Sequence, residues 1–197
     1  FDFQSKNWLY RNLFIPLIGE HQLINAAVAI CCVEKILMGT MSVDFERALI
    51  FEGLEKVRLI GRLQLIERRT KFLIDSAHSP ASFEALWKTI RELFCYNRLI
   101  VVIGLMKDKD LAAIGKIVVS SADEIIATQA FNNPRVCQAE EIVRMWSNFS
   151  IKPMRAISSA PQAIQAAQST AHKLDLICVT GSIYLAGEAL KLLHKSP

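Results

Sequence analysis

The sequence lacks the short motifs by which several large classes of protein are recognised. Its 197 residues contain neither GxxxxGK[ST], the phosphate-binding P-loop, nor GxGxxG, the dinucleotide-binding fingerprint. There is no HExxH pair and no Cys–His cluster, so we expect no metal site, zinc included. No run of 18 apolar residues is free of charge, which argues against a membrane partner.

The cysteines lack the pattern of a disulfide framework. Their number, five, is odd, and no two have CxxC spacing. Most lie in apolar runs, where a free cysteine behaves as a small hydrophobic residue. The pattern predicts a reducing, cytoplasmic location.

Strong charge is also missing. The net charge is +4, and the lysines and arginines are scattered, so no nucleic-acid partner is expected. With 52% hydrophobic residues, the chain can bury one good core and an additional piece. The first residues have neither an initiator methionine nor a signal-peptide pattern, and they resemble a hairpin entered midway. We therefore expect a fragment of a longer protein.

Two amphipathic helices are predicted before residue 60. The first begins near Gly19 and ends near Gly39, and the second covers 42–57 with Ser42 as a candidate N-cap. We place a domain boundary near residue 60. The apolar face expected for the first helix consists of Leu23, Ala26, Ala27, Ile30, Val33 and Leu37.

Strands and helices alternate after residue 60. Ranges 62–68 and 71–77 read as a hairpin or two adjacent strands, and a helix over 80–94 follows, with Ser79 as N-cap and Pro80 in its first turn. Such alternation predicts an α/β fold, a mostly parallel sheet with helices on both faces. The further strands expected are 98–105, 123–129, 153–158 and 175–182, and the further helices are 109–121, 136–149, 160–174 and 185–195.

Polar residues follow three of these strands. Asp75 and His78 end the stretch LIDSAHSP, range 104–109 follows the next buried strand, and range 181–182 follows the last. Ligands of open α/β sheets bind beyond the carboxyl ends of the strands, so one site can draw on all three. The alternative is ordinary: solvated turns in which Asp75, His78 and Asp110 only cap or lead into helices.

Five phrases carry a resemblance to a known family. In order they are GEHQLINAAVA, GLEKVRLIGRLQLI, LIDSAHSPAS, GLMKDKD and VTGSIYLAGE. Together they resemble the folylpolyglutamate synthase and dihydrofolate synthase family of the Mur ligase superfamily, from Pro16 to Glu188. The resemblance implies that residues 1–60 are the tail of a central ATP-binding domain. Residues 61–197 would be a Rossmann-like C-terminal glutamate-ligase domain.

The same resemblance implies an activity. Family members activate a folate carboxylate with ATP as an acyl phosphate and join it to the amine of L-glutamate. The expected small-molecule partners are ATP, L-glutamate and folate or dihydropteroate, with Mg²⁺ as cofactor and a monomer as the complete enzyme. The P-loop, the Mg²⁺ ligands and a modified lysine would precede this stretch, so the chain alone is expected to be inactive.

Nucleotide contacts carry over to three residues. Asn25 resembles the asparagine that contacts adenine, and an amide can read the adenine edge with one donor and one acceptor. Arg62 resembles the arginine that reaches the ATP phosphates, which suit a guanidinium. Asp75 resembles the acid that accepts from the ribose hydroxyls.

Glutamate contacts carry over to three others. His78 and Ser182 resemble residues that position the incoming L-glutamate, and Lys109 would meet its carboxylates. Arg62 and His78 are thereby the catalytic candidates.

The motif departs from the family pattern at three positions. The usual phrase DGAHNP is here DSAHSP, so Ser76 stands for a glycine and Ser79 for an asparagine, and Gln64 replaces the usual glutamate. We expect Ser76 to crowd a backbone conformation that glycine tolerates. Ser79 can still cap the following helix.

Two other functions stay open. One is a peptidoglycan-precursor Mur ligase, which fits DSAHSP and TGSIYLAGE less well. The other is a non-catalytic nucleotide- or ligand-binding module that keeps the fold without the ATPase domain. Reading the gene upstream of Phe1 separates the cases, because an open frame with P-loop residues indicates the ligase.

Overall fold

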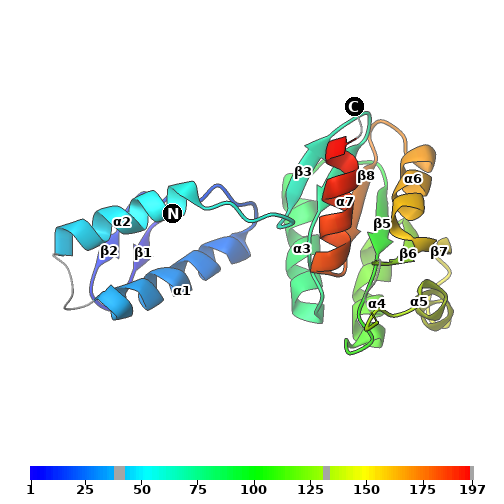
Figure 1. The fold of residues 1–197 in the computed structure, drawn as a ribbon, viewed down its shortest axis with the longest axis horizontal. Helices are drawn as coiled ribbons and strands as arrows, with labels where there is room; N and C mark the ends of the chain where they lie inside the picture. The colour runs from blue at the N-terminus through cyan, green and yellow to red at the C-terminus, as the bar shows by residue number, and fades with distance from the viewer. Residues whose placement is uncertain (38–42, 131–133, 196–197) are drawn as a thin grey trace. The chain divides into compact units, whose positions relative to one another are not determined.

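A six-stranded sheet forms the centre of the second half of the chain in the computed structural model, which describes residues 1–37, 43–130 and 134–195 (Figure 1). The hairpin of β3 and β4 is antiparallel, and every other neighbouring pair is parallel. The mostly parallel α/β sheet predicted from the sequence is confirmed. Across the sheet the strands are β3 (Gln64–Glu67), β4 (Lys71–Ile74), β8 (Leu176–Thr180), β5 (Leu99–Ile103), β6 (Glu124–Gln129) and β7 (Met154–Ser159).

The helices cover both faces of this sheet. The chain moves in one direction through β4, β5, β6 and β7, so right-handed crossovers place the intervening helices on one face. It then returns to β8, which places the next helix on the opposite face with the final one. In chain order the helices are α3 (Pro80–Leu93), α4 (Leu111–Ser121), α5 (Ala139–Trp146), α6 (Ala160–Thr170) and α7 (Ile183–Lys195).

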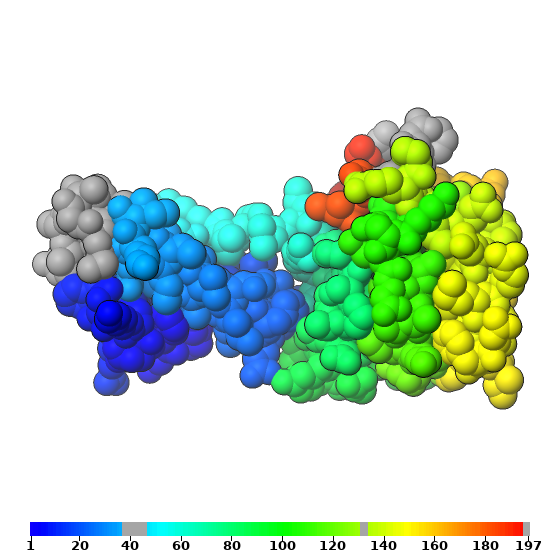
Figure 2. Space-filling model, turned by 90° about the horizontal axis from the view of Figure 1, so that it is seen from below, coloured from blue at the N-terminus to red at the C-terminus, as the bar shows by residue number. Residues whose placement is uncertain are grey.

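The packing explains the sequence pattern. All five residues of β5 and of β8 are buried, as a strand with helices on both faces requires. Three of the four alanines of α6 (Ala160, Ala163 and Ala167) are buried against the same sheet face as α7. Figure 2 shows the green-to-yellow segments of this part of the chain closed into a continuous surface.

The start of α3 follows the prediction in detail. Ser79 Oγ accepts from the backbone N–H of Ser82 at 3.3 Å, and Ser82 Oγ accepts from the N–H of Ser79 at 2.9 Å. This reciprocal capping box satisfies two N–H groups that the helix leaves unpaired. Pro80 fits the first turn, where no N–H is needed.

The first 59 residues form one compact unit, Phe1–Leu59, and the rest of the chain forms a second, Ile60–Pro197. It contains a short hairpin and the two predicted helices, around a core of Tyr10, Leu13, Ile30 and Ile50. Gly39 and Ser42, the expected helix end and N-cap, lie outside the described residues. The elements are β1 (Phe3–Gln4), β2 (Leu9–Tyr10), α1 (Glu20–Leu37) and α2 (Val43–Lys56).

One part of the expected apolar face of α1 is wrong. Val33 is 36% exposed, whereas its neighbour Glu34 is buried. Glu34 Oε1 accepts from Ser5 Oγ at 2.7 Å and from the Tyr10 hydroxyl at 2.8 Å. These hydroxyl donors make burial of a carboxylate possible, and the helix turns toward them. Other apolar residues of α1 are exposed, among them Ile24, and no described helix is long and apolar enough to cross a membrane.

Candidate functional site

A pocket of about 220 Å³ lies at the carboxyl ends of β4, β8 and β5, within the unit Ile60–Pro197. Three strand-to-helix connections contribute to it, as the sequence predicted, together with the segment before β3 and the one after β6. Pockets for drug-sized ligands occupy about 300–1,000 Å³, so this one suits a smaller molecule, of amino-acid size. The polar residues on which the argument depends are Arg62, Ser76, His78, Lys109, Arg135 and Ser182.

Backbone hydrogen bonds continue past the ends of β4, β8 and β5, so the three connections leave the sheet at the same edge. The N–H of Asp75 donates to the carbonyl of Val179 at 3.0 Å, and the N–H of Gly104 donates to the carbonyl of Thr180 at 3.1 Å. The chain then turns sharply at Gly181, whose φ is +109°. A Cβ at this glycine would lie 2.6 Å from the carbonyl oxygen of Gly104, so only glycine fits.

The Asp75 carboxylate holds the segment that carries Arg62. Asp75 is buried, and its Oδ2 accepts from the N–H of Leu63 at 3.0 Å while its Oδ1 accepts from the N–H of Ala77 at 2.7 Å. Leu63 has φ +46°, an unusual value for leucine, and the carboxylate fixes this conformation. Burial and, secondarily, the Asp75 carboxylate raise the pKa of the buried Cys178, so that thiol stays neutral.

Asp75 was expected at the site as a contact to the ribose hydroxyls, and this role stays a prediction. It does not belong to the described residues that line the pocket, although its neighbours Ser76 and His78 do. Its two oxygens already accept from backbone N–H groups, which is a structural task.

His78 lines the pocket, and one of its ring nitrogens is paired with a backbone carbonyl. Its Nδ1 lies 2.9 Å from the carbonyl oxygen of Ser76. A carbonyl can only accept, so Nδ1 carries the proton, and Nε2 of the neutral ring keeps its lone pair. The side chain is exposed, and its backbone N–H donates to Ser82 Oγ at 3.0 Å, which ties it to the start of α3.

Positive charge predominates among the residues that line the pocket. The charged lining residues are Arg62, Lys109 and Arg135 and one carboxylate, Asp108, so the lining has a formal charge of +2 when His78 is uncharged. Lys109 Nζ lies 3.0 Å from Asp108 Oδ2, and this contact with Lys109 holds the pKa of Asp108 below its ordinary value. The Arg62 guanidinium makes no hydrogen bond or ion pair with any described residue, so it is available to an anion.

Arg135 was missed by sequence reasoning. It follows no predicted strand directly, and no motif marks it. The pairing that brings it to the pocket is long-range: the N–H of Lys107 donates to the carbonyl of Arg135 at 2.8 Å, and Met106 forms a β-bridge with Val136. Only the folded chain places this arginine beside the loop after β5.

The start of α7 supplies further donors. Ser182 is buried, and its Oγ accepts from the N–H of Leu185 at 3.2 Å, the contact of an N-cap residue. Its hydroxyl proton is still available to a ligand. Ile183 and Tyr184, the first residues of α7, line the pocket, where a helix N-terminus favours negative charge.

Two buried hydroxyls at these strand ends have no hydrogen-bond partner among the described residues. They are Ser76 Oγ and Thr180 Oγ1, and of the two residues only Ser76 lines the pocket. The crowding expected at Ser76 does not occur, because the described non-glycine residues with positive φ are Asn12 and Leu63.

Asn25 lies on α1 in the first unit and is exposed; its Nδ2 donates to Gln22 Oε1 at 3.2 Å. It does not line the pocket. The described part of the chain contains no group of three or more His, Cys, Asp or Glu that would hold a metal ion.

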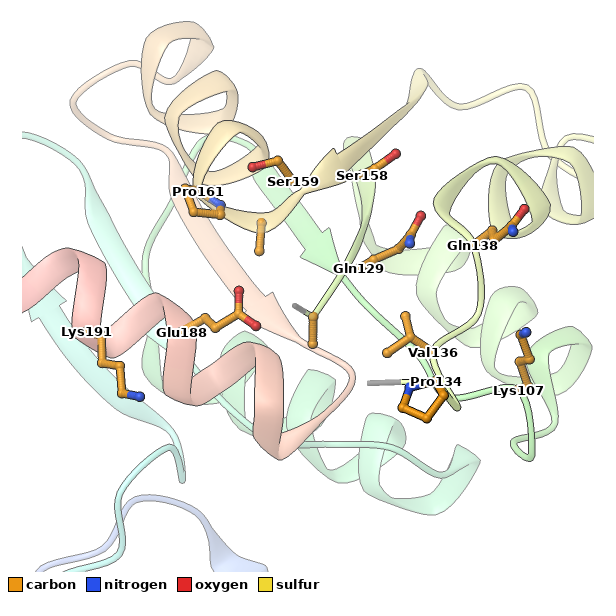
Figure 3. Close-up of a pocket in the computed structure, with 12 residues that line it drawn as sticks. Lys107, Gln129, Pro134, Val136, Gln138, Ser158, Ser159, Pro161, Glu188 and Lys191 are labelled. Atoms are coloured by element: carbon orange, nitrogen blue, oxygen red, sulfur yellow. The ribbon is translucent and has the colours of Figure 1, made fainter. Parts of the chain in front are cut away.

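A larger cavity, of about 1220 Å³, lies in the same unit (Figure 3). Glu188 and Lys191 of α7, Pro161 at the start of α6 and Gln129 at the end of β6 line it. Lys107 and Val136 line this cavity, whereas their neighbours Met106 and Arg135 line the smaller pocket.

Comparison with known proteins gives consistent matches. Residues 61–183 match the family described as Mur ligase, glutamate ligase domain. A dihydrofolate synthase/folylpolyglutamate synthase of Mycobacterium tuberculosis is 26% identical over 98% of this chain and 42% of its own length. The solved structure of M. tuberculosis folylpolyglutamate synthase complexed with ADP and AMPPCP has a TM-score of 0.81 at 28% identity, over 96% of this chain and 43% of that one.

A relative with a different substrate is also similar. The UDP-N-acetylmuramoyl-L-alanyl-D-glutamate–2,6-diaminopimelate ligase of Bacillus licheniformis is 30% identical over 85% of this chain and 34% of its own length. The chain thus spans less than half the length of each of these relatives.

Proposed function

Because the chain belongs to the Mur ligase family, through a glutamate ligase domain at residues 61–183, we propose that it binds the L-glutamate substrate of an ATP-dependent amide ligase acting on folate. The enzyme would be a folylpolyglutamate synthase, a dihydrofolate synthase or both. The similarity to the M. tuberculosis enzyme over nearly the whole chain supports the folate branch.

The observation that carries this proposal is the small cationic pocket. L-glutamate has two carboxylates and one amino group. Arg62, Lys109, Arg135 and the N-terminus of α7 suit the carboxylates. Nε2 of His78 can accept from the amino group, and removal of an ammonium proton is what prepares an amine to attack a carbonyl carbon.

The nucleotide contacts remain proposals. ATP would supply the phosphoryl group that activates the folate carboxylate. Arg62 would contact its phosphates and Asn25 its adenine, and Asp75 could add a ribose contact, since a carboxylate has about four acceptor positions. No cluster of described residues fits Mg²⁺, so we propose that other parts of the enzyme hold it.

A second candidate is a ligase of peptidoglycan precursors, which the similarity to the B. licheniformis enzyme favours. That relative is named for 2,6-diaminopimelate, which carries an additional amino group. A pocket whose lining has a formal charge of +2 does not suit a second ammonium, which places this candidate behind the first.

L-glutamate should bind saturably to the chain in isothermal titration calorimetry, and more tightly than 2,6-diaminopimelate. His78→Ala should weaken L-glutamate binding about fivefold, the loss of one hydrogen bond of about 1 kcal/mol. His172→Ala is the matched control, because this exposed histidine uses its backbone N–H, which the substitution retains. Tighter binding of 2,6-diaminopimelate would favour the second candidate, and no saturable L-glutamate binding would contradict the proposal.

We also expect that the chain alone does not hydrolyse ATP. Its sequence has no phosphate-cradling glycine loop, and one arginine, Arg62, does not replace such a loop. Phosphate release from purified protein is the measurement. Release that Arg62→Ala abolishes would refute this expectation.

A further inference from the structure

We infer that Ser76 is a substrate-binding residue of the pocket, whose hydroxyl donates a hydrogen bond to a carboxylate of the bound acidic amino acid. The inference rests on the proposed function, since it takes L-glutamate as the occupant. It assigns a task to a side chain that the catalytic and nucleotide candidates leave unused.

The first observation is the unpartnered hydroxyl. Ser76 is only 2% exposed, and its Oγ has no hydrogen-bond partner among the described residues. Buried hydroxyls almost always have a partner, and one without a partner calls for a ligand or a water. The residue lines the pocket, and rotation about χ1 is what would turn its buried Oγ toward that space.

The second observation is that the backbone around Ser76 is fixed on both sides. Its carbonyl oxygen lies 2.9 Å from the ring Nδ1–H of His78. The next N–H, that of Ala77, donates to Asp75 Oδ1 at 2.7 Å, and the preceding N–H, that of Asp75, donates to the carbonyl of Val179 at 3.0 Å. Only χ1 of Ser76 is left to turn, among three staggered positions, so little freedom is lost when a ligand accepts the hydrogen bond from its hydroxyl.

The third observation is the charge around the hydroxyl. Arg62 and Arg135 line the same pocket and draw an anion toward it. A hydrogen bond from a hydroxyl to a carboxylate is roughly twice as strong as one between neutral groups, so this donor favours an acidic ligand.

Calorimetry of the 197-residue chain with L-glutamate tests the inference. Ser76→Ala should weaken binding about tenfold, while the melting temperature stays at or slightly above that of the unsubstituted chain, because an unpaired buried hydroxyl is removed. Thr180→Val is the matched control: it also removes a buried, unpartnered hydroxyl, at a residue that does not line the pocket, and it should leave the affinity unchanged.

The outcomes separate the two proposals. If the unsubstituted chain and the Ser76→Ala variant bind L-glutamate with equal affinity, the assignment of Ser76 is overturned and the proposed function stands. Equal losses for Ser76→Ala and Thr180→Val overturn it too, because the effect would not be local to the pocket. No saturable binding of L-glutamate by the unsubstituted chain overturns the proposed function, and the assignment with it.

Discussion

Asp75→Ala should lower the free energy of unfolding of the unit Ile60–Pro197 by about 3 kcal/mol, because it strands two buried N–H groups at about 1–3 kcal/mol each. The carboxylate accepts from the N–H of Leu63 and from the N–H of Ala77, and Asp75 itself is 6% exposed. Without it, nothing among these contacts holds Leu63 at its φ of +46°. Arg62 should then lose its position in the pocket, and L-glutamate affinity should fall with stability. Urea unfolding and calorimetry measure the two effects.

Asp75→Asn is the informative partner of this variant. Its amide oxygen can accept one of the two N–H groups, but its NH₂ would face the other, so about half of the stability loss should remain. If Asp75 served only to bind ribose, both variants would keep the stability of the unsubstituted chain and lose affinity for nucleotide alone. That result would contradict the structural task assigned to Asp75.

The fold was predictable because its signals are local. Strand–helix alternation, the apolar runs of β5 and β8, and the N-cap at Ser79 each depend on neighbouring residues. The convergence of three polar strand ends was predictable as well, since parallel strands that leave a sheet at one edge bring their loops together.

The rest of the site depends on contacts between distant residues. Arg135 reaches the pocket through pairing with the loop after β5, and Asp75 is engaged by Leu63, twelve residues earlier. Glu34 is buried because hydroxyls of the first hairpin meet it. Hydrophobic periodicity and motif spacing describe residues that are close in the sequence, so they do not predict such long-range contacts. The motif predicted a nucleotide contact for Asp75, whereas the structure shows its carboxylate holding the backbone beside the pocket.

Gly181→Ala should be the most damaging small substitution at the pocket. The residue lies between the end of β8 and the start of α7 with φ +109°, a conformation that alanine adopts only under strain of about 1–3 kcal/mol. The new Cβ would lie 2.6 Å from the carbonyl oxygen of Gly104 and 3.0 Å from a side-chain carbon of Ile103. Ile103 ends the buried strand β5 and the buried Gly104 follows it directly, so neither can withdraw freely and the clash adds about 1–3 kcal/mol more.

The expected result is a loss of about 3 kcal/mol or more in urea unfolding, with L-glutamate binding lost, since relief of the clash must move the start of α7 away from the pocket. Gly187→Ala is the matched control within α7. A Cβ there meets nothing within 4 Å, and alanine favours a helix over glycine by about 1 kcal/mol, so this variant should be as stable as the unsubstituted chain or more so. Equal stability of the two variants would show that the turn at residue 181 tolerates a side chain. The placement of Ser182 and of the α7 N-terminus at the pocket would then not depend on glycine.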